Sequence, residues 1–279
     1  MTQPETRCLI CGADDFRSAC EKAGTRYVQC AGCGVVRQYP YPTADEIARY
    51  YANYQSHKSS TSVYLTDAGF DVFRRDKLLT FGDLGIPADG FTGKRICDVG
   101  CASGQFLQLM NELGATAPFG IDVSKECVDI AQSRGLACEE GNFLEVQRTF
   151  DVITLWHVVE HLPTPQAFIR HAYECLAPGG WLLIETPVIG AISEAFGADW
   201  RYYMPTEHIN LFPMEALVKL CNDTGFSLRS FTRFGSGNDS DKIPRPNKRA
   251  MDSIAKKFGF GDTLALWLVK NTSSTTGTH

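Results

Sequence analysis

The stretch RICDVGCASGQFLQLM, from Arg95 to Met110, decides the fold. A short apolar run, a glycine-containing turn and apolar residues at helical spacing predict a buried strand that leads directly into a helix. At the turn, Asp98, Gly100 and Gly104 form the pattern D-x-G-x-x-x-G. Glycines let the backbone turn tightly and approach a ligand, and a helix N-terminus favours negative charge. The stretch therefore predicts a ligand site at the end of a strand in an α/β fold.

The alternation of strands and helices continues on the C-terminal side. The segments with strand or helix periodicity are 117–124 (strand), 125–135 (helix), 136–142 (strand), 150–156 (strand), 165–180 (helix) and 181–187 (strand). Ser124 is the expected N-cap of the helix that follows it. This order predicts a parallel, doubly wound sheet. Two late strands, at 227–234 and 263–271, leave no room for a usual crossover, and residues 235–250 between them are expected to form a flexible, turn-rich loop or lid.

The composition is that of an ordinary globular protein. The 279 residues are 44% hydrophobic and 21% charged, with a formal net charge of −5. Proteins that bind nucleic acid through its phosphates usually present a basic face, so this charge argues against nucleic acid as the partner. No apolar run reaches the roughly 18–20 residues of a membrane span, and the N-terminus lacks the pattern of a secretory signal. We therefore expect a cytoplasmic protein.

The N-terminal cysteines predict a metal site. Cys8, Cys11, Cys30 and Cys33 form two C-x2-C pairs separated by eighteen residues, which is the spacing of a tetrahedral zinc ribbon. A redox dithiol would need only one pair and a thioredoxin-like context. Four thiolates leave no open coordination position, so the zinc is expected to be structural. Its ribbon could bind nucleic acid, pack on the main domain or gate the substrate.

The turn also indicates which ligand it binds. A dinucleotide-binding turn carries G-x-G-x-x-G, whereas this chain has Ala102 where the second glycine would be. Asp122 closes the next strand about 20 residues on, where an acidic side chain can accept hydrogen bonds from both ribose hydroxyls. A ribose-containing ligand without a pyrophosphate fits these features. S-adenosylmethionine is such a ligand.

The order and spacing of DVGCASGQF, GIDVS, GNFLE, FDVITLWHVVEHLPTP and LAPGGWLLIETP resemble those of class I S-adenosylmethionine-dependent methyltransferases over about residues 94–270. The resemblance implies a Rossmann-like sheet of seven strands whose last strand runs antiparallel. With the zinc ribbon included, the chain is similar to a bacterial subgroup common in polysaccharide and natural-product pathways, and distantly to deoxysugar C-methyltransferases. The implied organisation is a zinc ribbon at 1–40, a helical linker or cap at 41–90, the methyltransferase domain at 91–271 and a disordered tail at 272–279.

The resemblance also implies which residues hold the cofactor. The turn residues Asp98, Gly100 and Gly104 would hold its methionine part, and Asp122 its ribose. Two further residues would flank the adenine, where many relatives have Asp in place of the first: Asn142 and Phe143. The remaining expected cofactor contacts are Cys101, Val123, Trp156 and His157.

Two histidine-bearing clusters are candidates for catalysis. WHVVEHLP contains His157, Glu160 and His161, and MPTEHINLFP contains Glu207 and His208. Each cluster follows a predicted parallel strand, so both should face the crevice at the carboxyl edge of the sheet. Histidine titrates near neutral pH and suits a general base for methyl transfer. By similarity to the deoxysugar enzymes, His208 or His161 would be the base and Glu207 would orient it; alternatively, EHLP only shapes the cofactor pocket.

Other uses of these segments stay open. H-x-x-E-H with a distant histidine is similar to the divalent-metal motif of small-RNA 2′-O-methyltransferases, with His157 where a carboxylate is expected. Residues 39–57 contain a tyrosine-rich helical pattern that could roof a substrate pocket or merely connect the domains. Trp200, Tyr202 and Tyr203 could stack on a planar acceptor or pack as an ordinary loop.

Together these features predict a methyltransferase for a small-molecule or glycan acceptor, with O-methylation of a sugar or secondary metabolite as the leading hypothesis. The second form of the methyltransferase hypothesis is an RNA or tRNA methyltransferase that binds nucleic acid with its zinc ribbon. A non-catalytic interaction protein is the alternative from another class. The acceptor, the methylated atom and the oligomeric state do not follow from the sequence.

Overall fold

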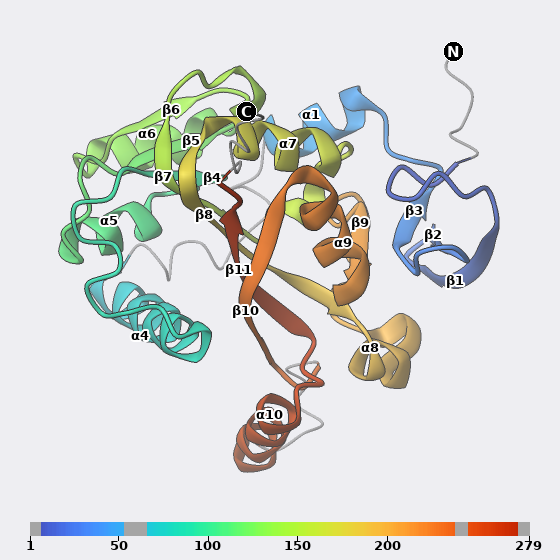
Figure 1. Cartoon of the computed structure of the whole chain (residues 1–279). Helices are drawn as coiled ribbons and strands as arrows, with labels where there is room; N and C mark the ends of the chain where they lie inside the picture. Colours follow the sequence, from blue (N-terminus) through green and yellow to red (C-terminus); the bar gives the residue numbers. More distant parts are fainter. Residues whose placement is uncertain (1–6, 53–65, 238–244, 273–279) are drawn as a thin grey trace, which may run out of the picture.

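The computed structural model describes residues 7–52, 66–237 and 245–272, and shows a central sheet with helices on both faces (Figure 1). The strand order in its main part is β6-β5-β4-β7-β8-β11-β10. Neighbouring strands are parallel except at β11, which is antiparallel to both β8 and β10. The prediction of a Rossmann-like sheet with an antiparallel final strand is confirmed.

The strands are β1 Phe16–Lys22, β2 Thr25–Cys30, β3 Val36–Tyr39, β4 Ile96–Val99, β5 Phe119–Asp122, β6 Cys138–Glu140, β7 Phe150–Trp156, β8 Leu176–Ile189, β9 Asn210–Pro213, β10 Phe226–Phe234 and β11 Thr263–Lys270. The helices are α1 Ala44–Ala52, α4 Asp67–Leu84, α5 Gln105–Glu112, α6 Lys125–Ser133, α7 Pro165–Cys175, α8 Ala191–Phe196, α9 Met214–Thr224 and α10 Arg245–Phe258. Short 3-10 helices lie at η1 Phe143–Glu145, η2 Val159–His161 and η3 Gly197–Asp199.

Alternate residues of the central strands enter two separate cores. In β8, Leu182 and Ile184 pack with α7 and α9 on one face, whereas Leu183 packs with α4 and α5 on the other. This division follows from the two-residue period of a strand. Both faces are covered, so these strands are continuously apolar, as expected of a buried parallel sheet. The predicted N-cap is confirmed as well, because the Ser124 side chain accepts a hydrogen bond from the Cys127 amide.

The N-terminal unit joins the main sheet through a strand that the sequence analysis missed. Strands β1, β2 and β3 form an antiparallel meander, and β3 pairs with β9, which lies parallel to the end of β8. Strand β9 has only four residues and starts two residues after His208. It therefore connects the N-terminal cysteine unit directly to the segment that carries the second histidine cluster.

The region between β10 and β11 differs from the prediction. Residues 235–250 were expected to form a loop, but helix α10 begins at Arg245 and ends at Phe258. Apolar residues continue at helical spacing beyond residue 250, which explains the helix. Residues 238–244 of this predicted loop lie outside the described residues, as do residues 273–279 of the tail expected at 272–279 and residues 53–65 of the linker. Within the described ranges, no helix is both long and apolar enough to cross a membrane.

Candidate cofactor and acceptor site

The turn after β4 depends on glycine for two separate reasons. Gly100 and Gly104 have φ angles of 70° and 85°, which favour glycine over any residue with a side chain. A Cβ atom at residue 100 would lie 2.6 Å from Cγ2 of Val158, and one at residue 104 would overlap Leu136. The sequence predicts both glycines from the tight turn and from the approach of a ligand. Packing against the protein itself also requires them.

Two buried carboxylates lie at the ends of β4 and β5. Thr154 donates a 2.6 Å hydrogen bond to Asp98, whose pKa burial raises to about 7. The two oxygens of Asp122 accept hydrogen bonds from the amides of Ala102, at 2.9 Å, and Ser124, at 2.8 Å. Burial raises the pKa of Asp122 too, although these backbone hydrogen bonds oppose the shift. Asp122 thus fixes the two neighbouring strand ends relative to each other, at the edge where a nucleoside is expected.

The other predicted cofactor residues divide into exposed and buried groups. Val123 is exposed beside this edge, and Asn142 caps η1 by accepting a 3.0 Å hydrogen bond from the amide of Leu144. Cys101 is buried behind the turn. The ring of Phe143 is only 2% exposed and packs in the core. The structure therefore does not leave the Phe143 ring at the surface, where it would flank an adenine.

Trp156 and His157 lie where the strand β7 ends. The Trp156 ring packs on Phe106 and beneath the ammonium group of Lys77, whose Nζ is 4.0 Å from the ring centroid. The buried indole Nε1 of Trp156 has no hydrogen-bond partner among the described residues. His157 has a φ of 54°, and its amide donates to the carbonyl of Glu185 at 2.7 Å. This backbone bond holds the chain in its turn away from the sheet.

His157 lies between two buried carboxylates. Its Nδ1 is 3.0 Å from Glu160, and its Nε2 is 3.4 Å from Glu185. Burial lowers the pKa of His157, but these carboxylates outweigh burial and raise it to about 9. The pKa of Glu160 falls to about 2, because the bond to His157 and the nearby imidazole charges outweigh burial. His157 is therefore part of an ion-pair network in addition to being a predicted cofactor contact.

Lys77 completes this network, and the sequence analysis missed it together with Glu185. The Nζ of Lys77 lies 2.7 Å from Glu185, and both side chains are less than 10% exposed. Burial would raise the pKa of Glu185, but the charges of Lys77 and His157 lower it to about 2. Lys77 belongs to α4, more than 100 residues before its partner. A single lysine in a helical stretch gives no signal of such a pairing.

The two histidine clusters meet, as predicted. The rings of His161 and His208 are 4.9 Å apart between centroids and nearly perpendicular. Nδ1 of His208 donates a 2.8 Å hydrogen bond to the carbonyl of Tyr202. Burial and the charge of His161 lower the pKa of His208 to about 4, so its imidazole is neutral at pH 7.

Helix α1 reaches both clusters through adjacent tyrosines. The Tyr51 hydroxyl is 2.9 Å from Nδ1 of His161, and the Tyr50 hydroxyl donates a 2.8 Å hydrogen bond to Glu207. The expectation that Glu207 orients His208 is thus not matched by the geometry. Glu207 accepts from Tyr50, while the backbone carbonyl of Tyr202 orients His208. These contacts favour the interpretation that the tyrosine-rich helix roofs a substrate pocket over the interpretation that it only connects the domains.

Only one of the three predicted loop aromatics lies beside the histidines. The Tyr202 ring is stacked at 6.3 Å from His157 and 5.9 Å from His208. Trp200 is fully buried and its indole donates to Asp262, and Tyr203 packs on the core. Ordinary packing therefore explains Trp200 and Tyr203.

The N-terminal unit holds the backbone of the second cluster. The side-chain amide of Gln38, in β3, donates a 2.9 Å hydrogen bond to the carbonyl of His208 and accepts from the amide of Thr206 at 3.3 Å. The backbone amide of Gln38 also donates a hydrogen bond to the carbonyl of Ile209 at 3.1 Å. The Gln38 side chain is buried. The position of His208 therefore depends on a strand from the cysteine unit.

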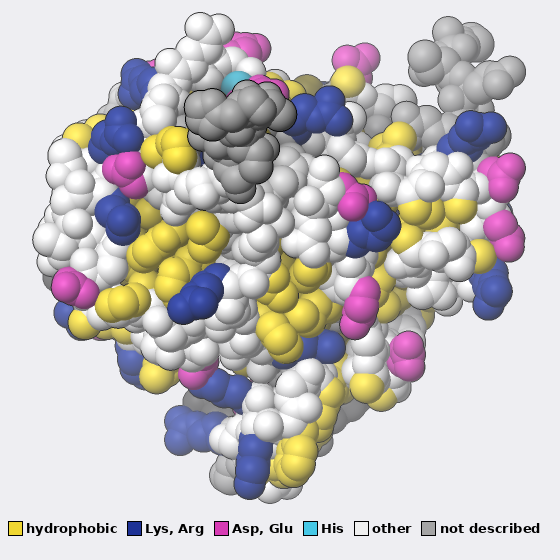
Figure 2. Space-filling view, in the orientation of Figure 1, with side chains coloured by type: hydrophobic (Ala, Val, Ile, Leu, Met, Phe, Trp, Pro, Cys, Tyr) yellow, Lys and Arg dark blue, Asp and Glu magenta, His cyan; other side chains and the backbone are white. Residues whose placement is uncertain are grey.

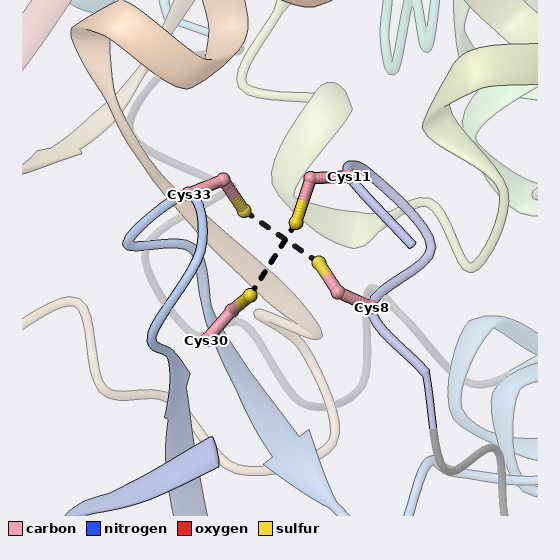
Figure 3. Close-up of side chains that lie close together, drawn as sticks. All are labelled: Cys8, Cys11, Cys30 and Cys33. Carbon is pink, nitrogen blue, oxygen red and sulfur yellow. Dashed lines mark hydrogen bonds between the residues drawn. The ribbon is translucent and has the colours of Figure 1, made fainter. Parts of the chain in front are cut away.

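Among the described residues, two groups of side chains have the arrangement of metal ligands. In the first, Sγ of Cys8 lies 3.6 Å from that of Cys33, and Sγ of Cys11 lies 3.5 Å from that of Cys30 (Figure 3). These separations exclude disulfides, which are about 2.05 Å long, and approach the spacing of about 3.8 Å that a tetrahedral Zn–S bond of about 2.3 Å implies. The cluster is compatible with a zinc ribbon.

The second group comprises Glu160, His161 and His208, whose nearest ligand atoms lie within 4.8 Å of one another. His157 is not a member, although the metal interpretation of the sequence included it. Its Nδ1 instead bonds to Glu160. A metal at this place would therefore have a different ligand set from the one expected.

This fold, with its glycine turn and the acidic side chain that ends β5, defines a Rossmann-like S-adenosylmethionine-dependent methyltransferase. Residues 70–231 match the sequence profile of a family described as "Methyltransferase domain". The chain belongs to that family.

Known proteins agree with this assignment. The ubiquinone biosynthesis O-methyltransferase of Leptothrix cholodnii is 27% identical over 157 residues, which are 49% of this chain and 66% of that protein. The protein of the same name from Paraburkholderia phymatum is 34% identical over 179 residues, or 54% and 75% of the two chains. Others of this name match over less than half their length, such as that of Vibrio parahaemolyticus at 46%. In structure, magnesium protoporphyrin IX methyltransferase from Synechocystis PCC 6803 covers 82% of this chain and 100% of its own, with a TM-score of 0.57 and 16% identity.

Proposed function

We propose that this enzyme methylates a hydroxyl oxygen of a small-molecule or glycan acceptor, and that His208 is the general base. The orientation of the His208 ring carries the proposal. A carbonyl oxygen only accepts hydrogen bonds, so the 2.8 Å contact with Tyr202 requires the proton on Nδ1. The lone pair is then on Nε2. A neutral imidazole in one fixed tautomer is suited to accept a proton from a hydroxyl group.

The cofactor supplies the electrophilic methyl group, and the residues at the ends of β4 and β5 fit its nucleoside and methionine parts. Asp122 is fixed at this edge by two backbone amides and can accept the ribose hydroxyls through its remaining lone pairs. The turn from Gly100 to Gly104 and Asp98 beneath it would hold the methionine part. Nε1 of Trp156, which has no hydrogen-bond partner in the part of the chain that the structure describes, is a further donor at the end of β7.

The acceptor would lie between helix α1 and the two clusters. Polar groups of Tyr50, Tyr51 and Glu207 gather there, near His208 and the Tyr202 ring stacked on it, and they suit a hydroxylated molecule such as a sugar or a phenol. The O-methyltransferase names of the sequence relatives support oxygen as the methylated atom. On transfer, Nε2 of His208 would accept the proton of the acceptor hydroxyl, whose oxygen would receive the methyl group that the cofactor supplies, with a neutral thioether as the leaving group.

We also propose that the four N-terminal thiolates hold one structural zinc ion. Their sulfur separations suit a tetrahedral site, and the turns carrying Gly12 and Gly34 close each C-x2-C pair with amide-to-carbonyl hydrogen bonds of 2.8 and 2.9 Å. The ion would stabilise the unit from which β3 and Gln38 extend.

The base assignment is tested by comparing His208→Gln with His171→Gln. His171 lies on α7 and bonds to the carbonyl of Val146, away from both clusters, so it is the matched control. The assay follows labelled methyl transfer from S-adenosylmethionine to a panel of sugars and phenols, and calorimetry follows binding of S-adenosylhomocysteine. We expect His208→Gln to lower kcat by about 10²-fold or more with unchanged cofactor affinity, and His171→Gln to keep kcat within about twofold.

Two results would overturn this assignment. One is wild-type turnover in His208→Gln. The other is turnover that is lost on chelation and restored by a divalent metal while the four-cysteine site stays loaded, because Glu160, His161 and His208 would then act as ligands.

A further inference from the structure

Helix α10 exposes most of its own apolar residues. It extends from the end of the sheet at the bottom of Figure 1, between β10 and β11. Among its described side chains, Ala255 is the only one that is fully buried. Met251, Ile254 and Phe258 are 38%, 49% and 69% exposed. Their spacing of three and four residues places them on one face of the helix.

The same helix is basic in an acidic protein. Residues 245–258 contain five Lys and Arg residues and one Asp, whereas the whole chain has a net charge of −5. Lys248 pairs with Asp252 within the helix and Lys256 pairs with Asp83 of α4, whereas Arg249 and Lys257 are exposed. Figure 2 shows basic and hydrophobic side chains next to each other at the bottom of this face. A basic helix with an exposed apolar face is the pattern of helices that lie in the interface of an anionic membrane.

The position of α10 relates it to the candidate site. Strand β10 is antiparallel to β11, which is antiparallel to β8, so α10 follows β10 at the edge where β7 and β8 also end. The segment that returns from α10 into β11 contains Asp262 and Thr263. Asp262 accepts from the Trp200 indole, and Thr263 bonds to the Tyr202 hydroxyl at 3.0 Å. A surface that docks on α10 therefore lies at the edge of the sheet that carries the acceptor cluster.

We infer that α10 docks this enzyme on an anionic lipid surface, with Met251, Ile254 and Phe258 entering the headgroup boundary and the exposed charges of Arg249 and Lys257 strengthening the attraction to the lipid phosphates. The charge of the helix favours this occupant over a second copy of the chain, because two α10 helices meeting face to face would bring like charges together. The inference goes beyond the proposed methyl transfer and does not depend on it. Lipid binding is measured without cofactor or acceptor.

The test is co-sedimentation of the full chain with vesicles of phosphatidylcholine alone or with 30% phosphatidylserine. Two double variants remove the two contributions separately: Ile254→Glu/Phe258→Glu and Arg249→Glu/Lys257→Glu. The matched control is Lys125→Glu/Lys219→Glu, which reverses the same charge at two exposed lysines on α6 and α9. All these side chains are at the surface, and retained S-adenosylhomocysteine binding verifies that each variant is folded.

We expect the wild type to bind the anionic vesicles at least tenfold more tightly than the neutral ones, with binding weakened by 0.5 M salt. Each α10 variant should bind at least tenfold more weakly, and the control within about twofold of wild type. The inference is wrong if the wild type binds neither vesicle, or if the control loses binding as much as the α10 variants. It is also wrong if the wild type is a dimer in solution that Ile254→Glu/Phe258→Glu converts to a monomer, since a second copy would then cover this face.

Discussion

Replacing Gln38 with leucine should impair turnover without weakening cofactor binding. The buried side chain of Gln38 donates to the carbonyls of His208 and, at 3.5 Å, Met204, and accepts from the amide of Thr206; leucine has a similar volume but removes all three bonds. Leaving a buried backbone group without its partner costs about 1–3 kcal/mol. Loss of these three bonds, of which the one to Met204 is long and weak, should lower the free energy of unfolding by about 2–4 kcal/mol once the groups are partly rehydrated. The freed segment then lets the His208 ring shift, and a displacement of about 1 Å can lower a rate by about 10²-fold.

The measurement is kcat together with the affinity for S-adenosylhomocysteine. The cofactor residues belong to β4 and β5, on the far side of β7 and β8 from β9, so the affinity should stay within about twofold of wild type. Gln29→Leu is the matched control. Gln29 is also a glutamine of the N-terminal unit that bonds to a backbone carbonyl, that of Gly34, but it does not contact the His208 segment. If kcat falls equally in Gln29→Leu and Gln38→Leu, or if cofactor affinity falls in parallel with kcat, the N-terminal unit does not position His208.

Three further predictions concern the ion-pair network, the metal and the turn. The pKa of His157 is raised to about 9, so protonated His157 stabilises the fold fully below pH 6.5, and this contribution is lost as the pH rises through about 9. Because the side chain is 39% exposed, the contribution is about 1–2 kcal/mol. The free energy of unfolding of His157→Gln, measured in urea, should lack this decline with pH. Elemental analysis should find one zinc per chain in the wild type and none in Cys11→Ser. In that variant kcat should fall by a larger factor than the cofactor affinity. A zinc content equal to that of the wild type would refute the ligand assignment. Gly100→Ala should lower the free energy of unfolding by about 2–4 kcal/mol, because it combines a φ of 70° with a 2.6 Å contact to Val158. Gly135→Ala is the control, since residue 135 has a φ of 76° but lies in open space, and it should lower this free energy by only about 1 kcal/mol. Equal losses in the two variants would show that packing does not matter at the turn.

Features encoded by neighbouring residues could be predicted from the sequence. The strand and glycine turn around Asp98, the Ser124 cap and the two C-x2-C pairs each depend on a few adjacent positions. The meeting of His161 with His208 was also foreseen, because parallel strands end at one edge of a sheet.

Features that depend on distant partners could not be predicted in this way. Strand β9 has four residues and is defined by its pairing with β3, some 170 residues earlier. Lys77 pairs with Glu185, which lies 108 residues later in the chain. Glu207 accepts a hydrogen bond from a tyrosine of α1 and not from the adjacent histidine. Helix α10 was missed for another reason, since turn-forming residues before it concealed its start.

The most direct test of the central claim is calorimetric titration of S-adenosylhomocysteine into the full chain, its Asp122→Ala variant and its His208→Gln variant. The claim is that the strand ends at Asp98 and Asp122 hold the cofactor while the histidine cluster serves the acceptor. It predicts one binding site per chain, weakened at least tenfold (about 1.4 kcal/mol) in Asp122→Ala and unchanged in His208→Gln. No binding by the wild type, or wild-type affinity in Asp122→Ala, would contradict it.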